Sequence, residues 1–205
     1  VLFEAPLAAG LIGSLVHAVS GGALYRKSSF LLDHLGKRVM PEFVQLSERP
    51  HIRCGLGSSS FDSDGVATSD REVVTDGILQ GYFLSTYTAR KLGMQTTGNA
   101  GGSHNLILQP GEDNFAGLLA KMNRGLLVTE LLGQGVNYVT GDYSRGAAGF
   151  WVENGKIAYP VEEITIAGNL KTMLAGIVAV GRDVQVRGSK QTGSILIDRM
   201  TVAGE

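Results

Sequence analysis

The sequence has little cysteine and no excess of charge of either sign. Cys54 is the only cysteine in 205 residues, which excludes an intramolecular disulfide framework and favours a reducing compartment. We therefore expect a cytoplasmic location. Lys and Arg number 18 against 19 Asp and Glu, a net charge of −1, and they are dispersed along the chain. This balance gives no sign of the basic patch that nucleic-acid-binding proteins carry.

Long apolar runs are also absent. The most apolar stretch, residues 1–19, is interrupted by Glu4, Pro6 and His17, so its clean run is shorter than the ~20 residues that a membrane-spanning helix requires. Apolar residues recur in it at roughly helical spacing. The stretch predicts a helix from about Leu7 to Val19 that is buried in a globular core, and no membrane partner is expected.

Glycine is what the chain has in excess. It contributes 29 residues, about twice the usual share of ~7%, without a collagen period. So much glycine indicates tight turns and close backbone approaches. Asp76-Gly77 and Asn154-Gly155 each separate runs of β-forming residues and predict two hairpins. The sequence thus predicts an α+β fold with a mostly antiparallel, curved, barrel-like sheet and a few packed helices.

Periodicity and capping residues predict the other elements. The expected helices are a short turn at 30–35, a helix at 85–92, a helix at 113–124, and one that starts after Asn169 and includes Ile177 and Val178. The expected strands are 39–46, 106–108, 126–132, 164–168, 194–197 and 200–202.

Catalytic motifs are scarce. The chain has no Gly-x-Ser-x-Gly elbow. No two of the four histidines lie within four residues of each other: His17, His34, His51 and His104. Asp62 and Asp64 precede Gly65 as in a calcium loop, but Ala67 stands where the next oxygen ligand would be needed. A turn whose aspartate side chains bond their own backbone is the favoured interpretation.

Three segments resemble the PmbA/TldD family, also called modulators of gyrase: 19–33, 141–155 and 163–170. In that family the TldD-type subunit carries a His-Glu-x-x-x-His zinc motif. Aligned without gaps, Glu4 takes the place of the first histidine, Ala5 of the glutamate and Ala9 of the second histidine. Thr192 is the nearest counterpart of a third ligand, a cysteine. A methyl group offers a metal no lone pair, so the zinc site is missing from this chain. What the chain closely resembles is the PmbA branch of the family, also called TldE, which lacks the metal ligands of TldD.

The resemblance implies that residues 1–205 form the C-terminal domain of a PmbA/TldE-like protein whose N-terminal α/β domain is absent from this chain. It implies a subunit with no catalytic residue and no metal of its own, inactive as an enzyme when alone. A TldD-type partner would hold the zinc in a heterodimer. The complex would cleave unfolded peptides in peptide maturation and antitoxin degradation, and no direct contact with nucleic acid is expected.

Three groups of polar residues are candidates for contacts with a peptide or a partner subunit. They are Arg26 and Lys27; Thr97, Gly98 and Asn99; and Asp142, Tyr143 and Arg145. Each group also has a plainer interpretation. The first is then a solvated basic pair, the second a connecting loop, and the third an aspartate–arginine pair that holds a loop.

Two other functions stay open at this point. The fold could assemble a catalytic site of its own from distant residues, although a lone histidine is more often structural. Alternatively, the chain could be a homodimeric peptide-binding or structural module that adds an extended strand to a sheet edge without cleavage. A stable complex with a zinc-bearing homologue would distinguish the heterodimer from a homodimer that binds peptides alone.

Overall fold

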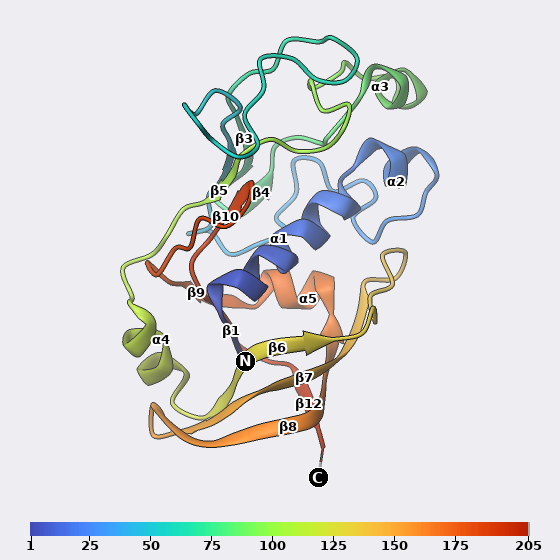
Figure 1. Ribbon diagram of the computed structural model, residues 1–205. Coiled ribbons are helices and arrows are strands. Elements are labelled where there is room, and N and C mark those ends of the chain that lie inside the picture. The colour runs from blue at the N-terminus through green and yellow to red at the C-terminus, as the bar shows by residue number, and fades with distance from the viewer. Residues whose placement is uncertain (205) are drawn as a thin grey trace. The chain divides into compact units, whose positions relative to one another are not determined.

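The computed structural model describes residues 1–204, which fold as two compact units (Figure 1). Unit 1 comprises Val1–Leu11, Pro110–Gln185 and the chain from Thr192 on. Unit 2 comprises Ile12–Gln109 and Val186–Gln191. Both units are therefore assembled from segments that are far apart in the sequence.

Unit 1 is built on a seven-stranded sheet with the order β12-β8-β7-β6-β1-β11-β9. Its strands are β1 (Leu2–Phe3), β6 (Gly125–Leu132), β7 (Asp142–Glu153), β8 (Lys156–Asn169), β9 (Ile177–Val180), β11 (Ile195–Ile197) and β12 (Thr201–Ala203). Every neighbouring pair is antiparallel except β1 and β6. The long strands β7 and β8 are curved in Figure 1. The predicted α+β fold with a curved, mostly antiparallel sheet is confirmed.

The hairpin between β7 and β8 turns at Asn154 and Gly155, as predicted. Their φ angles are 52° and 71°, and Glu153 pairs with Lys156 across the turn. Two successive positive φ angles define a type I′ turn, whose twist matches that of the flanking strands. Asparagine and glycine are the residues that adopt this backbone at least cost, so the local sequence alone predicts the hairpin.

The core of unit 1 gathers around its central strands. Leu2 of β1, Leu127 of β6 and Leu196 of β11 are buried in one apolar cluster. Helix α4 (Phe115–Met122) adds Leu118 and Leu119 to this cluster. The apolar residues whose helical spacing predicted α4 thus form the stripe that packs against the sheet. A second helix of this unit, α5 (Leu170–Ala175), follows β8 directly.

Unit 2 contains a five-stranded sheet with the order β10-β5-β2-β3-β4. Its strands are β2 (Leu46–Glu48), β3 (Arg71–Thr75), β4 (Ile78–Leu79), β5 (Leu106–Leu108) and β10 (Lys190–Gln191). The predicted hairpin at Asp76-Gly77 joins β3 to β4. Two helices complete the unit: α2 (Gly21–Tyr25) and α3 (Thr86–Leu92). Helix α3 starts at a Ser85 cap and ends at Gly93, as predicted.

The predicted N-terminal helix is α1 (Ala5–Ala18). It starts two residues before Leu7 because Pro6 fits a first turn, where its missing N–H has no partner to lose. Ala8, Leu11 and Leu15 are buried along it. No helix formed by residues 1–204 combines the length and the apolar character needed to cross a membrane.

Two predictions for the region before β2 are wrong in detail. Within 39–46 only Leu46 is in a strand, because Val39 and Met40 donate their N–H groups to the Gly77 carbonyl instead of pairing in a sheet. Residues 30–35 form turns rather than helix. The helix lies earlier, in α2, where the Ser20 side chain accepts the Ala23 N–H.

The helix after Asn169 is shorter than predicted. Asn169 caps it as expected, with its side chain accepting the Lys171 N–H, but α5 ends at Ala175. Ile177 and Val178 belong to β9 instead. Both are β-branched residues that favour strands, and Gly176 separates them from the helix. Their apolar spacing alone did not distinguish the two outcomes.

Candidate functional site

The start of α1 is the first candidate site. Strand β1 delivers the chain into α1, and the Glu4 carbonyl accepts the N–H groups of Leu7 and Ala8 at 2.9 and 2.8 Å. A cavity of about 300 Å³ lies beside this first turn and is lined by Glu4, Ala5, Phe115, Asp183, Gln185 and Ser194. By the resemblance, TldD-type subunits carry their metal ligands in this region. The donor atoms present here therefore decide whether this chain can bind a metal.

The polar groups around the cavity are largely bonded to the chain itself. Asp183 accepts the Ser194 backbone N–H at 3.0 Å through Oδ1 and the Ser194 hydroxyl at 2.6 Å through Oδ2. Thr192 is 1% exposed, and its hydroxyl donates to the Gly193 carbonyl at 2.8 Å. The carboxylate of Asp183 therefore holds β11 beside the loop that follows β9.

The residues at these positions do not fit a catalytic zinc. Such a site needs three protein ligands and an open position. Glu4 offers one carboxylate, Ala9 offers a methyl group, and the Thr192 hydroxyl is buried and already bonded. Nowhere in residues 1–204 do three His, Cys, Asp or Glu side chains gather closely enough to hold a metal ion.

The corner at Gly141–Arg145 is the second candidate. Asp142 accepts the Thr140 hydroxyl at 2.6 Å and the Asn169 amide at 3.2 Å, and these hydrogen bonds hold the pKa of Asp142 below its ordinary value. Arg145 donates weakly to the Leu132 carbonyl at 3.5 Å. Asp142 thus fastens the end of β8 to the loop before β7, and the plainer interpretation of an Asp142–Arg145 pair is wrong.

Tyr143 lies at the same corner but points inward. It is 3% exposed, and burial raises the pKa of its phenol, while Arg145 nearby acts in the opposite direction. A buried phenol contacts neither a peptide nor a subunit unless the corner opens. Among the three residues predicted at this corner, Asp142 is the one whose side chain is exposed.

The Thr97-Gly98-Asn99 loop is the third candidate, and its side chains are bonded within unit 2. Asn99 is 5% exposed and donates to Glu48 Oε1 at 2.9 Å. Thr97 donates its hydroxyl to Asn99 Oδ1 at 2.7 Å. The Gly98 carbonyl lies 3.0 Å from His104 Nε2. These contacts fix the loop and leave little of it to face a ligand.

Glu48 is the centre of this loop network. It is 1% exposed, its Oε2 accepts Arg71 Nε at 2.6 Å, and its Oε1 also accepts the His104 backbone N–H at 2.7 Å. The Arg71 guanidinium carbon lies 4.6 Å from the centre of the Phe83 ring. A buried carboxylate with three donors is well compensated, so this network is structural.

The turn at Phe61–Gly65 is present as predicted. Asp62 Oδ1 accepts the backbone N–H groups of Asp64 and Val66 at 2.9 and 3.0 Å, and its Oδ2 accepts the Ala100 N–H at 2.9 Å. Burial alone would raise the pKa of Asp62, but the three backbone donors, with His104 nearby, hold that pKa below its ordinary value. The carboxylate thus joins this turn to the Thr97–Asn99 loop.

Comparison with known proteins shows which family the chain belongs to. Residues 1–204 match the family described as the PmbA/TldA metallopeptidase C-terminal domain. The chain belongs to this family. A metalloprotease PmbA homologue of Haemophilus influenzae is 56% identical over 205 residues, which is 100% of this chain and 46% of the relative. The chain thus spans about half the length of the PmbA proteins that it matches.

Solved structures agree with this PmbA/TldA assignment. A Bacteroides thetaiotaomicron protein described as a candidate modulator of DNA gyrase matches with a TM-score of 0.94 and 34% identity, covering 100% of this chain and 46% of that one. TldE from Thermococcus kodakarensis matches with a TM-score of 0.84 and 25% identity, covering 99% and 49%. The family resemblance inferred from the sequence is therefore confirmed over the whole chain.

Sequence reasoning missed several residues of this PmbA/TldA domain. Glu48 and Arg71 were not singled out, because an acidic residue in a short strand and a basic one 23 positions later look like ordinary surface charges. Asp183 and Ser194 were missed for the same reason, since only the pairing of β11 with β9 brings them together. No local signal in the sequence would have found either pair.

Proposed function

We propose that this chain is part of a non-catalytic PmbA/TldE-type subunit. It pairs with a zinc-bearing TldD-type subunit and supports the cleavage of unfolded peptides in the cytoplasm. The observation that carries the proposal is the donor set at the start of α1, where Glu4, Ala9 and Thr192 provide too few ligands for a catalytic zinc although a cavity lies beside the helix. Similarity to TldE over nearly the whole chain supports the same assignment.

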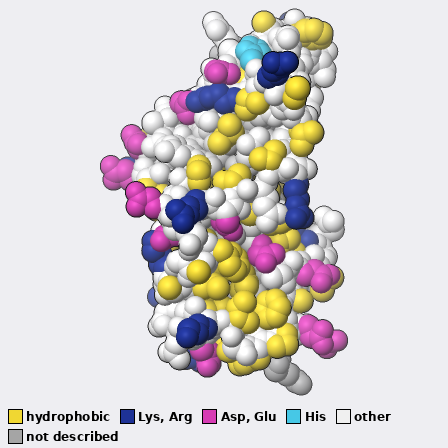
Figure 2. Space-filling model, turned by 60° about the vertical axis from the view of Figure 1, so that its left-hand side comes forward, with side chains coloured by type: hydrophobic (Ala, Val, Ile, Leu, Met, Phe, Trp, Pro, Cys, Tyr) yellow, Lys and Arg dark blue, Asp and Glu magenta, His cyan; other side chains and the backbone are white. Residues whose placement is uncertain are grey.

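The outer strands of unit 1 support a role as a subunit. Figure 2 shows apolar side chains gathered on the surface of unit 1. Ile157 and Tyr159 of β8 are 48% and 50% exposed. Nearby, Trp151, Val161 and Val202 help to line a shallow pocket of about 280 Å³. Exposed apolar patches of this kind often mark protein interfaces.

The candidate contact residues have two different roles in this proposal. Arg26, Lys27 and Asp142 are exposed and are proposed to meet a peptide or the partner subunit. Thr97, Gly98 and Asn99 are proposed to shape the wall behind such a peptide, because their polar atoms are bonded inside unit 2.

Mixing experiments test the proposal. The purified protein, a TldD-type subunit from the same organism, and their mixture are each assayed for cleavage of an unfolded peptide and for bound zinc. We expect cleavage only in the mixture, its loss on treatment with a chelator, and zinc that follows the TldD-type subunit. Chelator-sensitive cleavage by the protein alone, or full activity of the partner alone, would refute a supporting role.

A further inference from the structure

Helices α2 and α3 of unit 2 are held in close contact by a glycine. A Cβ atom added to Gly21 would lie 2.3 Å from the Thr88 hydroxyl and 2.9 Å from a methyl group of Leu84. Only glycine permits so close an approach without a shift of its neighbours. As a result, Tyr25 at the end of α2 meets Tyr87 of α3 edge to face, with ring centres 5.9 Å apart and planes at 85°.

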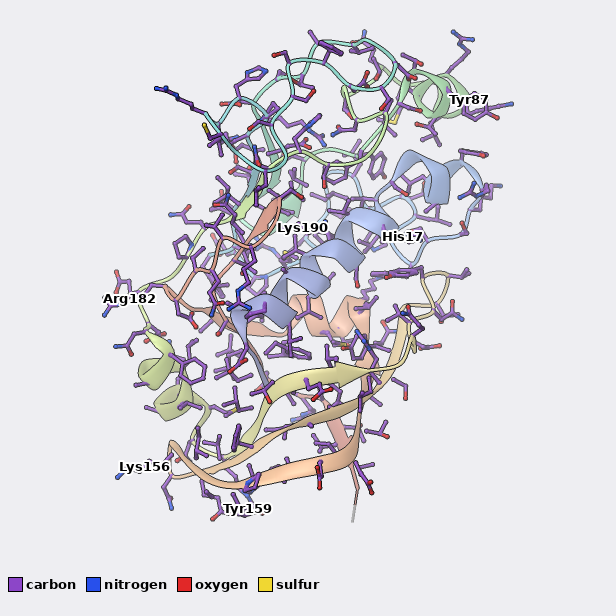
Figure 3. All side chains as sticks on the ribbon, viewed as in Figure 1. His17, Tyr87, Lys156, Tyr159, Arg182 and Lys190 are labelled. Carbon is purple, nitrogen blue, oxygen red and sulfur yellow. The ribbon has the colours of Figure 1, made fainter. Side chains whose placement is uncertain are left out.

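Each of these tyrosines has a cation over its ring. The Arg26 guanidinium carbon lies 5.3 Å from the centre of the Tyr25 ring, and Arg26 Nη1 donates to the Tyr25 hydroxyl at 3.4 Å. Lys91 Nζ lies 5.6 Å from the centre of the Tyr87 ring. Tyr87 itself is 56% exposed and projects from α3 in Figure 3. Cation–π contacts of this kind restrict two flexible side chains before any ligand arrives.

The positive charges at these helix ends make no ion pair with an acidic residue of the described chain. Lys27 and Arg90 are exposed beside Arg26 and Lys91, and none of the four makes an ion pair within 4.0 Å among residues 1–204. Asp64, near the start of α3, is already bonded to the Thr86 N–H and hydroxyl at 2.9 and 2.5 Å. We call these residues the basic helix-end surface: Tyr25, Arg26, Lys27, Tyr87, Arg90 and Lys91.

The geometry favours carboxylates over nucleic acid as the ligand. Non-specific single-strand binding relies on aromatic faces that stack with successive bases. Here each tyrosine has a face covered by a cation, and the two rings meet edge to face rather than forming a parallel platform. The guanidinium of Arg26 presents a planar fork of N–H donors that matches a carboxylate or a phosphate, so it is the arrangement of the two rings that argues against a nucleic-acid strand.

We propose that the basic helix-end surface binds acidic segments of unfolded peptides, rich in Asp and Glu. The proposal rests on the proposed function in so far as these peptides are substrates of the complex. It adds a preference that the cavity at the start of α1 does not provide. Long-range attraction would raise the local concentration of acidic peptide, and Arg26 and Lys91 would contact its carboxylates directly.

Fluorescence anisotropy with labelled peptides tests the proposal on the purified protein. The probes are a Glu-rich peptide, a neutral Gly/Ser peptide and a Lys-rich peptide of equal length, with oligothymidine as the nucleic-acid probe. We expect the Glu-rich peptide to bind most tightly and to weaken as salt is raised. Arg26→Glu combined with Lys91→Glu should lower its affinity by about tenfold or more.

A matched control carries the same change of charge elsewhere. Lys156 and Lys171 are exposed and lie in unit 1, and Lys156→Glu with Lys171→Glu should leave binding of the Glu-rich peptide within about twofold of the unchanged protein. Equal losses in the two double variants would show a general charge effect and overturn the proposal. Tighter binding of oligothymidine than of the Glu-rich peptide would overturn it as well.

A gain of binding in the same variant distinguishes a specific loss of affinity from misfolding. The variant with Arg26→Glu and Lys91→Glu should bind the Lys-rich peptide better than the unchanged protein does. A variant that had merely unfolded would not show this gain. Tyr87→Ala alone, with Arg26 and Lys91 unchanged, should weaken binding of the Glu-rich peptide, because the ring no longer positions the Lys91 ammonium. Absence of the gain in a variant with an unchanged circular dichroism spectrum would refute the proposal. The assay uses neither the partner subunit nor cleavage, so its failure is distinguishable from failure of the proposed function.

Discussion

Two polar regions of unit 2 look alike in sequence and differ in what their side chains contact. Around the Thr97–Asn99 loop, Asn99 and Glu48 are buried and their polar atoms bond to other parts of the unit. At the ends of α2 and α3, Arg26 and Lys91 are exposed, lie over tyrosine rings and make no ion pair within residues 1–204. Whether the fold supplies a partner decides if a polar residue supports structure or remains available for a ligand. Four variants test this difference.

Glu48→Gln should have the largest effect. The change keeps the side-chain shape but removes the charge opposite Arg71, whose side chain is only 16% exposed. Leaving one charge of a buried pair unmatched costs about 3–5 kcal/mol, measured as the free energy of unfolding in urea. Asp70→Asn is the control, because Asp70 is 3.9 Å from Arg49 in a pair exposed to solvent and should cost under about 1 kcal/mol. Similar losses in the two variants would contradict a structural role for the network.

Gly21→Ala tests the contact that builds the basic helix-end surface. The added methyl group would overlap the Thr88 side chain, and Thr88 also caps α3 by accepting the Ser85 N–H at 3.0 Å. We expect a loss of about 1–3 kcal/mol in unfolding free energy. Gly10→Ala in α1 is the matched control, since nothing lies within 4 Å of its added methyl group, and it should stabilise the chain by about 0.5–1 kcal/mol. A neutral Gly21→Ala variant would show that α2 and α3 pack loosely.

Asp62→Asn should have a smaller effect that depends on pH. The pKa of Asp62 is lowered in the folded chain, so its ionised form stabilises the fold above the unfolded pKa of about 3.9. This contribution is lost as the pH falls through the still lower folded pKa. At pH 7 the variant should lose on the order of 1–2 kcal/mol, because asparagine keeps one acceptor but no charge. The difference from the unchanged protein should shrink near pH 3, and a difference that grows on acidification would contradict the sign of the shift.

Arg26→Gln with Lys91→Gln should have the smallest effect on stability. Both residues are exposed and make no ion pair within the described chain, so the free energy of unfolding should stay within about 0.5 kcal/mol. A loss comparable to that of Glu48→Gln would show that these cations support the fold and would remove the contrast between the two regions.

The fold was predictable where local chemistry decides it. Asn154-Gly155 and Asp76-Gly77 determine their hairpins because few residues adopt two positive φ angles, and Ser85 with Gly93 delimits α3. Strand β10 and the parallel pairing of β1 with β6 were not predictable. Such short strands carry no periodicity, and their partners lie far away in the sequence.

The candidate site was predictable only in part. The shortage of metal ligands among Glu4, Ala9 and Thr192 follows from the residues themselves once the motif is aligned. The contacts of Asn99 and Asp142 do not, because a hydrogen bond to Glu48 or to Asn169 depends on pairings that only the folded chain creates. Residue type predicted the chemistry available at a position, and tertiary structure determined whether that chemistry was already in use.

The strand order has a consequence for how the chain is made. Strand β11 lies between β1 and β9 in one sheet, and β10 pairs with β5 at the edge of the other. Both strands come from residues 190–197, so neither sheet is complete until the ribosome has passed them. Contacts between segments so distant in sequence slow folding and keep strand edges exposed in the nascent chain. A product that stops at Gln185 would lack β10 from one sheet and both β11 and β12 from the other, so the cell's quality control would encounter two incomplete units rather than one.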